Sequence, residues 1–345
     1  MVNIASSHAK YNAEAALRGG APSTHWLRES CTIPVAMKLL RYGPVGREQP
    51  GMLDSHGIIR ALGDHVRDIG PEEISPAGLR KLAAIDPSSL PAVPGGPRLG
   101  LPCIGTRKFI AIGLNYADHA AETNAAIPSE PVVFMKAISC LQGPDDEVVI
   151  PRDSSKTDWE VELGVVIGTT ARYVEEHAAL EHVAGYVLVN DISEREFQME
   201  RGGTWDKGKG CDTFGPVGPW LVTRDEIGDV QNLDLWLDVN GKRMQTGNTR
   251  TMIFGVSKLV SYVSRFITLE PADLITTGTP PGVGLGHKPQ PLYLKPGDSM
   301  RLGIEKLGEQ RQALVAWRRP DRRRRATVRV RRFCARFATG LQWRL

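Results

Sequence analysis

Long apolar runs are missing from this 345-residue sequence. No stretch approaches the ~20 apolar residues that a helix needs to cross a bilayer, and the N-terminus lacks the compact apolar segment of a signal peptide. Cysteines are few: the five present are scattered and form no C-x-x-C pair. That pattern suits a reducing compartment and argues against a disulfide framework or a structural zinc site. We therefore expect a cytoplasmic protein without a membrane partner.

A strongly basic body is missing as well, although the net charge is +4. Residues 318–345 contain 11 Arg and one Asp, so the other 317 residues carry a net charge of −6. This mildly acidic balance gives no support to a nucleic-acid-binding fold. The Arg-rich tail could serve as a nucleic-acid arm, but its scarcity of apolar and acidic residues is more typical of a disordered extension.

Nucleotide-binding motifs are the third absence. The glycine-rich run 277–286, TGTPPGVGLG, is neither G-x-G-x-x-G nor G-x-x-x-x-G-K-[ST], which argues against a nucleotide site. Its backbone N–H groups and the Thr279 hydroxyl could hold a substrate carboxylate. A purely structural turn fits the same residues equally well.

The distribution of strand-like and helical runs favours a mixed, mainly β (α+β) fold. Strand-like runs outnumber helical ones and do not alternate with them as βαβ units would. The stretch 298–305 is expected to be the closing strand. The expected parts of the chain are a loose leader at 1–36, a small β-containing domain with a Pro- and Gly-rich linker at 37–102, a main domain at 103–317, and the Arg-rich tail at 318–345.

Two acidic residues alternate with apolar ones in the stretch 156–168, KTDWEVELGVVIG. In a strand, this spacing places Glu160 and Glu162 on one face. A second strand-like run, 183–189, ends directly before Asp191, where the Asp191 side chain can approach a neighbouring strand. Three oxygen ligands without a soft ligand suit Mg²⁺, Mn²⁺ or Ca²⁺ better than zinc. The alternative is a solvated acidic face on a half-buried strand.

A histidine and a glutamate stand three residues apart in a segment that is expected to be helical. This spacing makes His119 and Glu122 neighbours on one helix face. A carboxylate beside an imidazole fixes its tautomer and raises its basicity, as the activation of a water molecule requires. Without a metal site nearby, the pair would more often be a solvated helix face.

Cationic and amide side chains follow the predicted metal ligands. Arg195 and Gln198 come four and seven residues after Asp191, so a helix beginning there would present all three on one side. Lys209 lies in the glycine-rich stretch 202–216. Such donors near a divalent ion are what an α-keto carboxylate or an enolate oxygen requires. For Lys209 the competing interpretation is a solvated loop, which the residues alone favour slightly.

The sequence resembles the fumarylacetoacetate hydrolase family over residues 37–317. Five separate motifs agree with the family in order and spacing: GLNYADHAAE, DWEVELGVVIG, VNDISEREFQ, GGTWDKGKGCDTFGP and TTGTPPGVG. The resemblance implies a homodimeric, β-rich roll with a small N-terminal domain. It also implies a Mg²⁺ or Mn²⁺ site.

The resemblance assigns a role to each candidate residue. It implies metal ligands at Glu160, Glu162 and Asp191, and a water-activating dyad of His119 and Glu122 on a mobile lid. It further implies that Lys209 contacts the substrate and takes part in catalysis. The other residues that it implies contact the substrate are Arg195, Gln198 and Thr279. The sequence shows no departure from the family pattern at these positions.

Within the family, the sequence is most similar to bacterial hydrolases of 2,4-diketo-3-deoxy-sugar acids of the L-fuconate or L-rhamnonate type. This implies metal-dependent hydrolysis of a C–C bond in a 2,4-diketo acid, either such a sugar acid or an acylpyruvate, giving pyruvate and a short hydroxy acid. Ureidoglycolate lyase, oxaloacetate decarboxylase and 2-hydroxyhepta-2,4-diene-1,7-dioate isomerase use the same scaffold and stay open as alternatives. Outside enzymes, the alternatives are a metal-stabilised scaffold and a nucleic-acid binder acting through the tail.

Overall fold

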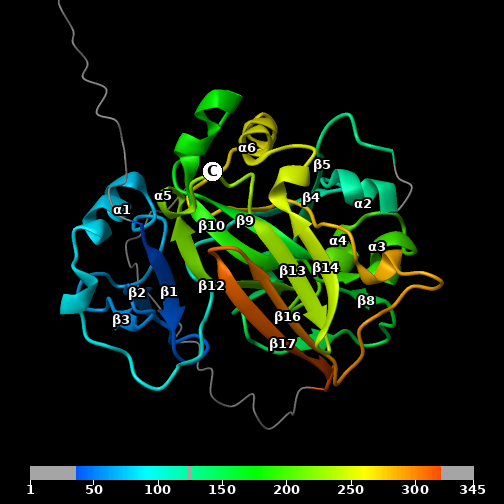
Figure 1. The fold of residues 1–345 in the computed structure, drawn as a ribbon, viewed down its shortest axis with the longest axis horizontal. Coiled ribbons are helices and arrows are strands. Elements are labelled where there is room, and N and C mark those ends of the chain that lie inside the picture. The colour runs from blue at the N-terminus through cyan, green and yellow to red at the C-terminus, as the bar shows by residue number, and fades with distance from the viewer. Residues whose placement is uncertain (1–35, 123–125, 320–345) are drawn as a thin grey trace, which may run out of the picture. The chain divides into compact units, whose positions relative to one another are not determined.

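Two neighbouring strands at the centre of the fold are buried on both faces. β9 (Val161–Ile167) and β10 (Val183–Asn190) consist mainly of apolar residues and glycine, and every residue in them is buried. Strands of this composition form where a sheet is covered on both sides. The computed structural model describes residues 36–122 and 126–319 (Figure 1). The expected leader up to residue 35, and the expected tail from residue 320, lie outside this described part.

These two strands belong to a large mixed sheet. Most neighbouring strands in it are antiparallel, whereas β15 runs parallel to β4, and β6 (Leu141–Gln142) runs parallel to β12. The order across the sheet is β3 (Ile59–Ala61), β2 (Gln49–Leu53), β1 (Lys38–Tyr42), β12 (Gly215–Thr223), β10, β9, β15 (Leu274–Thr276), β4 (Phe109–Gly113) and β5 (Val132–Lys136).

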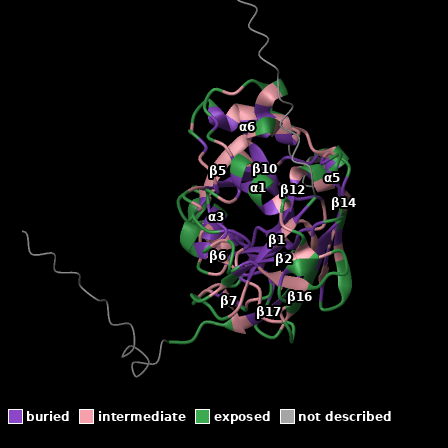
Figure 2. Cartoon of the chain, turned by 90° about the vertical axis from the view of Figure 1, so that its left-hand side faces the viewer, coloured by how far each residue is buried: buried purple, intermediate pink, exposed green. Residues whose placement is uncertain are grey.

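A second sheet contacts the first, and its strands lie in front of β9, β10 and β12 in Figure 1. Its order is β14 (Lys242–Asn248), β13 (Asp234–Val239), β16 (Ser299–Ile304), β17 (Gly308–Ala316) and β7 (Val148–Ile150). A short separate ladder joins β8 (Thr157–Asp158) to β11 (Ser193–Glu194). Figure 2 shows that buried residues follow the central strands, while exposed residues follow the outer loops and helices.

Short helices surround the sheets. The α-helices are α1 (Pro76–Ala83), α2 (Ala117–Glu122), α3 (Arg195–Met199), α4 (Asp206–Lys209), α5 (Arg224–Ile227) and α6 (Val256–Ser264). Short 3-10 helices span Pro87–Ser89, Ile138–Cys140, Glu176–His182, Thr249–Thr251 and Gly284–Gly286. None of the helices in the described ranges has the length and apolar character to cross a membrane.

The mainly β architecture expected from the sequence is confirmed. β1, from the expected N-terminal domain, pairs with β12 of the expected main domain, so strands of both parts share one sheet. The domain division at residue 103 stays a prediction.

The expected closing strand at 298–305 is present as β16, but it is not the last strand. β17 follows it, and its inward-facing residues include Gln310 and Gln312, both buried. Their amides donate to carbonyl oxygens in the core, among them Leu188 O at 2.8 Å. The prediction missed β17 because buried glutamines replace the apolar residues that normally reveal a strand.

Candidate active site

Three buried carboxylates converge where β9 and β10 lie side by side. Glu160 directly precedes β9, Glu162 lies within it, and Asp191 directly follows β10. The antiparallel register pairs Val189 with Glu162, and the Asp191 N–H donates to Glu160 O at 2.9 Å. One oxygen from each side chain lies within 4.8 Å of the others. The structure therefore brings together the three acids that the sequence assigns to a metal.

The three acids differ in their electrostatic environment. Burial and the neighbouring charges of Asp191 and Glu160 raise the pKa of Glu162 well above its usual value. Its Oε2 accepts hydrogen bonds from Thr276 Oγ1 at 2.5 Å and from Gly278 N at 2.8 Å. Burial alone would also raise the pKa of Glu160, but adjacent cations outweigh burial and bring that pKa to about 2.

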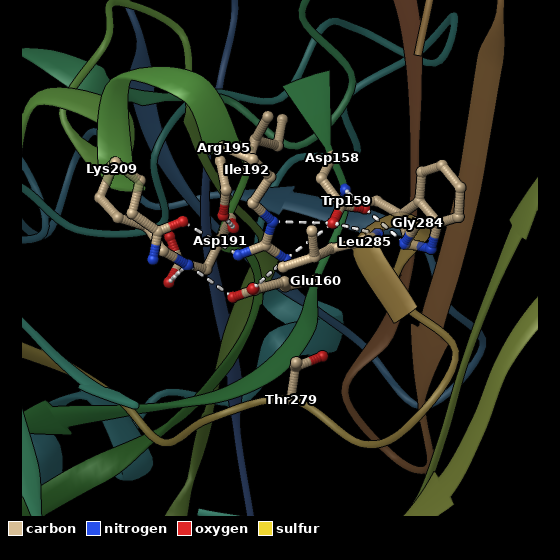
Figure 3. A network of polar contacts seen from close by, with 12 residues as sticks. Asp158, Trp159, Glu160, Asp191, Ile192, Arg195, Lys209, Thr279, Gly284 and Leu285 are labelled. Carbon is tan, nitrogen blue, oxygen red and sulfur yellow. Dashed lines mark hydrogen bonds and ion pairs between the residues drawn. The ribbon is translucent and has the colours of Figure 1, made fainter. Parts of the chain in front are cut away.

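Two basic side chains contact the acids (Figure 3). Lys209 Nζ lies 2.6 Å from Glu160 Oε2 and 2.8 Å from Asp191 Oδ2. Arg195 Nη2 lies 2.7 Å from Glu160 Oε1. Burial opposes the charge on Lys209, yet the charges of Asp191 and Glu160 raise its pKa above the usual value. The solvated-loop interpretation of Lys209 is wrong, because its side chain is only 3% exposed.

Sequence reasoning missed Asp158, which orients the arginine. Its Oδ2 accepts from Arg195 Nε at 2.8 Å, and its Oδ1 accepts from Gly284 N at 2.6 Å. Arg195 Nη1 in turn donates to Gln198 Oε1 at 3.1 Å. Asp158 lies in the same acid-rich stretch as Glu160, which could have drawn attention to it. Its partners Arg195 and Gly284 are distant in the sequence, so their contacts with it could not be predicted. Asp158 joins the 277–286 turn to the guanidinium group.

A buried lysine was missed as well. Lys136, the last residue of β5, is 2% exposed, and its Nζ lies 2.6 Å from Asp191 Oδ1. It also donates to Ile192 O at 3.3 Å and to Lys209 O. In the sequence, a lysine that follows the apolar run VVFM is typical of a solvent-exposed strand end. Only the tertiary fold brings Lys136 into contact with Asp191.

The His119–Glu122 pair is formed as the spacing predicts. His119 Nδ1 and Glu122 Oε2 lie 3.1 Å apart in α2. The Glu122 carboxylate also accepts from Gly282 N at 3.2 Å. The glutamate thus contacts the histidine on one side and the 277–286 turn on the other, which restricts its rotation.

A pocket of about 250 Å³ brings most of the candidate residues to one space. The candidates that line it are His119, Glu160, Glu162, Arg195, Gln198, Lys209 and Thr279. Glu122 and Asp191 do not line it but contact residues that do, namely His119 and Lys209. The structure therefore connects all the sequence-predicted site residues.

Thr279 takes part in the protein's own hydrogen bonds. Its hydroxyl donates to Val161 O at 2.9 Å and accepts from Gln245 Nε2 at 2.8 Å. The single hydroxyl proton is therefore used within the protein. The predicted contact between Thr279 and the substrate stays a prediction.

The acid cluster fits a hard divalent cation. It offers carboxylate oxygens alone, in a buried site, and its like charges lie close together. Among the described residues, ion pairs link Asp158, Glu160 and Asp191 to Lys136, Arg195 and Lys209, and none of these pairs includes Glu162. A divalent ion would supply the positive charge that Glu162 lacks.

Comparison with known proteins agrees with this geometry. A family model described as fumarylacetoacetate (FAA) hydrolase C-terminal matches residues 108–315, more than half of the chain. The chain belongs to the fumarylacetoacetate hydrolase family. A protein of Burkholderia ambifaria named "Putative hydrolase" is 63% identical over 278 residues, which cover 80% of this chain and 98% of that protein.

Two solved structures are similar over most of the chain. The fumarylacetoacetate hydrolase of psychrophilic Exiguobacterium antarcticum is 36% identical with a TM-score of 0.73, covering 81% of this chain and 100% of that one. A probable 2-hydroxyhepta-2,4-diene-1,7-dioate isomerase of Mycobacterium abscessus is 33% identical with a TM-score of 0.70, covering 83% and 100%. These names support an enzyme and include two different reactions.

Proposed function

We propose that this member of the fumarylacetoacetate hydrolase family is a metal-dependent hydrolase that cleaves a C–C bond of a 2,4-diketo acid. The substrate is a 2,4-diketo-3-deoxy-sugar acid or an acylpyruvate, and the products are pyruvate and a short carboxylic acid. The observation that supports this most is that His119, paired with Glu122, lines the same pocket as Lys209 and the acid cluster. Hydrolysis needs a base and an anion-stabilising group on one substrate.

The dyad supplies the base. Glu122 accepts from Gly282 N, so its carboxylate is held while it contacts His119 Nδ1. This contact places a proton on Nδ1 and leaves Nε2 as the basic nitrogen. Nε2 then takes a proton from water as the water oxygen bonds to the C4 carbonyl carbon.

The cationic side of the pocket accepts the charge that forms next. When the C3–C4 bond breaks, its electron pair moves to the pyruvyl fragment as an enolate, which is then protonated at C3. Lys209 and Arg195, both buried and charged, are suited to stabilise the enolate and the C1 carboxylate. A Mg²⁺ or Mn²⁺ ion held by Glu160, Glu162 and Asp191 would supply Lewis-acid stabilisation of the same oxygens.

The test is pyruvate release from a panel of acylpyruvates, 2,4-diketo-3-deoxy-sugar acids and oxaloacetate, with Mg²⁺ or Mn²⁺ and again with EDTA. The proposal predicts one carboxylic acid per pyruvate, and only with the metal. Metal-independent pyruvate release, or turnover of oxaloacetate alone, would refute it.

The isomerase named among the similar structures is the second candidate. Isomerisation of 2-hydroxyhepta-2,4-diene-1,7-dioate needs a base that moves a proton, and His119 could serve in that reaction too. A dienol that shifts its double bond without forming pyruvate would favour isomerisation. Glyoxylate from ureidoglycolate would instead favour the lyase. The homodimer implied by the family resemblance is likewise a proposal, which light scattering of the purified protein tests.

A further inference from the structure

We propose that the acyl end of the substrate is apolar, and that Trp205 selects it. This inference rests on the proposed function and narrows its substrate class to acylpyruvates with a hydrocarbon tail. The pocket lining combines charged and apolar side chains. The apolar side chains in the described lining are Ile112, Leu114, Phe134, Met199, Trp205, Val283 and Leu285.

The polar side chains in the described lining bond to one another and to the backbone, and so offer a hydroxylated tail few donors and acceptors. Each polar side chain lining the pocket, among the residues that the structure describes, contacts another group of the protein. Gln198 Oε1 accepts a hydrogen bond from Arg195, and the Thr279 hydroxyl donates its hydrogen bond to Val161 O. Hydroxyl groups buried without partners lose their hydrogen bonds to water, so a sugar-acid tail is penalised here.

The aromatic part of the wall begins beside the proposed reaction centre. Lys209 Nζ lies 5.4 Å from the ring centre of Phe134. Phe134 packs edge to face against Trp205, with ring centres 5.1 Å apart and planes at 65°. The carboxylate end of a diketo acid is attracted to the cations. In a pocket of about 250 Å³, the remaining substituent therefore lies against these rings.

The indole of Trp205 lies in space that is open because residue 113 is a glycine without a side chain. At Gly113, the last residue of β4, an added Cβ would lie 2.5 Å from Trp205 Cζ3 and 2.9 Å from Cη2. No real Cβ approaches another atom so closely, so even Gly113→Ala must displace the indole. β4 and Trp205 are thus fitted to each other, and this contact fixes one wall of the pocket.

The experiment compares matched substrates. kcat/KM is measured for an acylpyruvate with a propyl tail and for the same acid with a dihydroxypropyl tail. We expect a preference of about 100-fold for the propyl acid, the order of discrimination that an apolar pocket reaches against added hydroxyl groups. Equal rates, or a faster sugar-type acid, would overturn the inference while leaving the hydrolase intact. Absence of pyruvate from both series would overturn the proposed function and this inference together.

Variants then assign the preference to the indole. Trp205→Ser and Gly113→Ala should each reduce the propyl preference about 10-fold or more, whereas Trp205→Leu should keep it, because an apolar side chain remains. Trp317→Ser is the matched control, since Trp317 is exposed and does not line this pocket. If the ratio of kcat/KM for the propyl acid to that for the dihydroxypropyl acid is unchanged in Gly113→Ala and Trp205→Ser, Trp205 does not select the tail.

Discussion

The ammonium group of Lys136 lies 2.6 Å from Asp191 Oδ1, and both side chains are almost completely buried. The other oxygen, Asp191 Oδ2, is left to Lys209 Nζ at 2.8 Å. Lys136 also donates to the backbone oxygen of Lys209. One buried cation thus orients a candidate metal ligand and holds the residue that faces the substrate pocket. Interactions that position metal ligands in this way typically affect metal affinity ~10–100-fold.

We predict that Lys136→Met weakens both folding and metal binding. Asp191 would keep Lys209 at Oδ2 but lose its second cationic partner at Oδ1, which costs about 1–3 kcal/mol of unfolding free energy. Mn²⁺ affinity should fall at least ~10-fold. Denaturant unfolding and calorimetric Mn²⁺ titration measure the two effects.

The control is the same substitution in a solvent-exposed ion pair. Lys156 pairs with Glu200, and both side chains are at least a third exposed. Lys156→Met should therefore change stability by no more than ~1 kcal/mol. Equal behaviour of the two variants would contradict the role given to Lys136.

A divalent ion should stabilise the protein through the acid cluster. At 100 times its Kd, a ligand of the native state adds about 2.7 kcal/mol of stability, seen as a rise in Tm. Glu162→Gln should abolish that rise, because it removes one of three closely spaced acidic ligands. Without metal the variant should be about as stable as the wild type, since burial and the neighbouring acids raise the pKa of Glu162 and already disfavour its charged form. Glu309→Gln, at an exposed carboxylate, should keep the full metal response.

The dyad should affect turnover without affecting metal binding. His119→Ala and Glu122→Gln should lower kcat by about 10²–10⁴-fold, the usual contribution of a positioned base and its partner. Both variants should keep the Mn²⁺-dependent rise in Tm, since neither side chain belongs to the acid cluster. His56→Ala, at an exposed histidine, is the control. Near-normal turnover in His119→Ala would remove the histidine from the mechanism.

The local spacing of the sequence predicts much of this site. Alternation in 156–168 puts Glu160 and Glu162 together, and the end of the next buried strand brings in Asp191. The helical spacing of His119 and Glu122 predicts their contact. These relationships depend on one strand, one helix turn and one strand end, which are short-range patterns that a sequence carries directly.

Long-range partners are not visible in the same way. Lys136 is buried because β5 pairs with β4 and ends behind Asp191, which no local pattern reveals. Thr279 has a hydroxyl group that could bind a substrate, yet this hydroxyl donates its hydrogen bond to Val161 O. The buried face of β17 combines Leu314 with Gln310 and Gln312, whose amides bond to core carbonyl groups. In each case a polar side chain is satisfied by a segment far away in the sequence.

The central claim is that water adds to the C4 carbonyl and the C3–C4 bond then breaks. Turnover of a propyl-tailed acylpyruvate in water labelled with heavy oxygen tests it most directly, with mass spectrometry of the acid product. The account predicts at least one heavy oxygen in the carboxylate of the released acid, equimolar pyruvate, and neither product with EDTA. An unlabelled acid, or a rearranged diketo acid without bond cleavage, would contradict it.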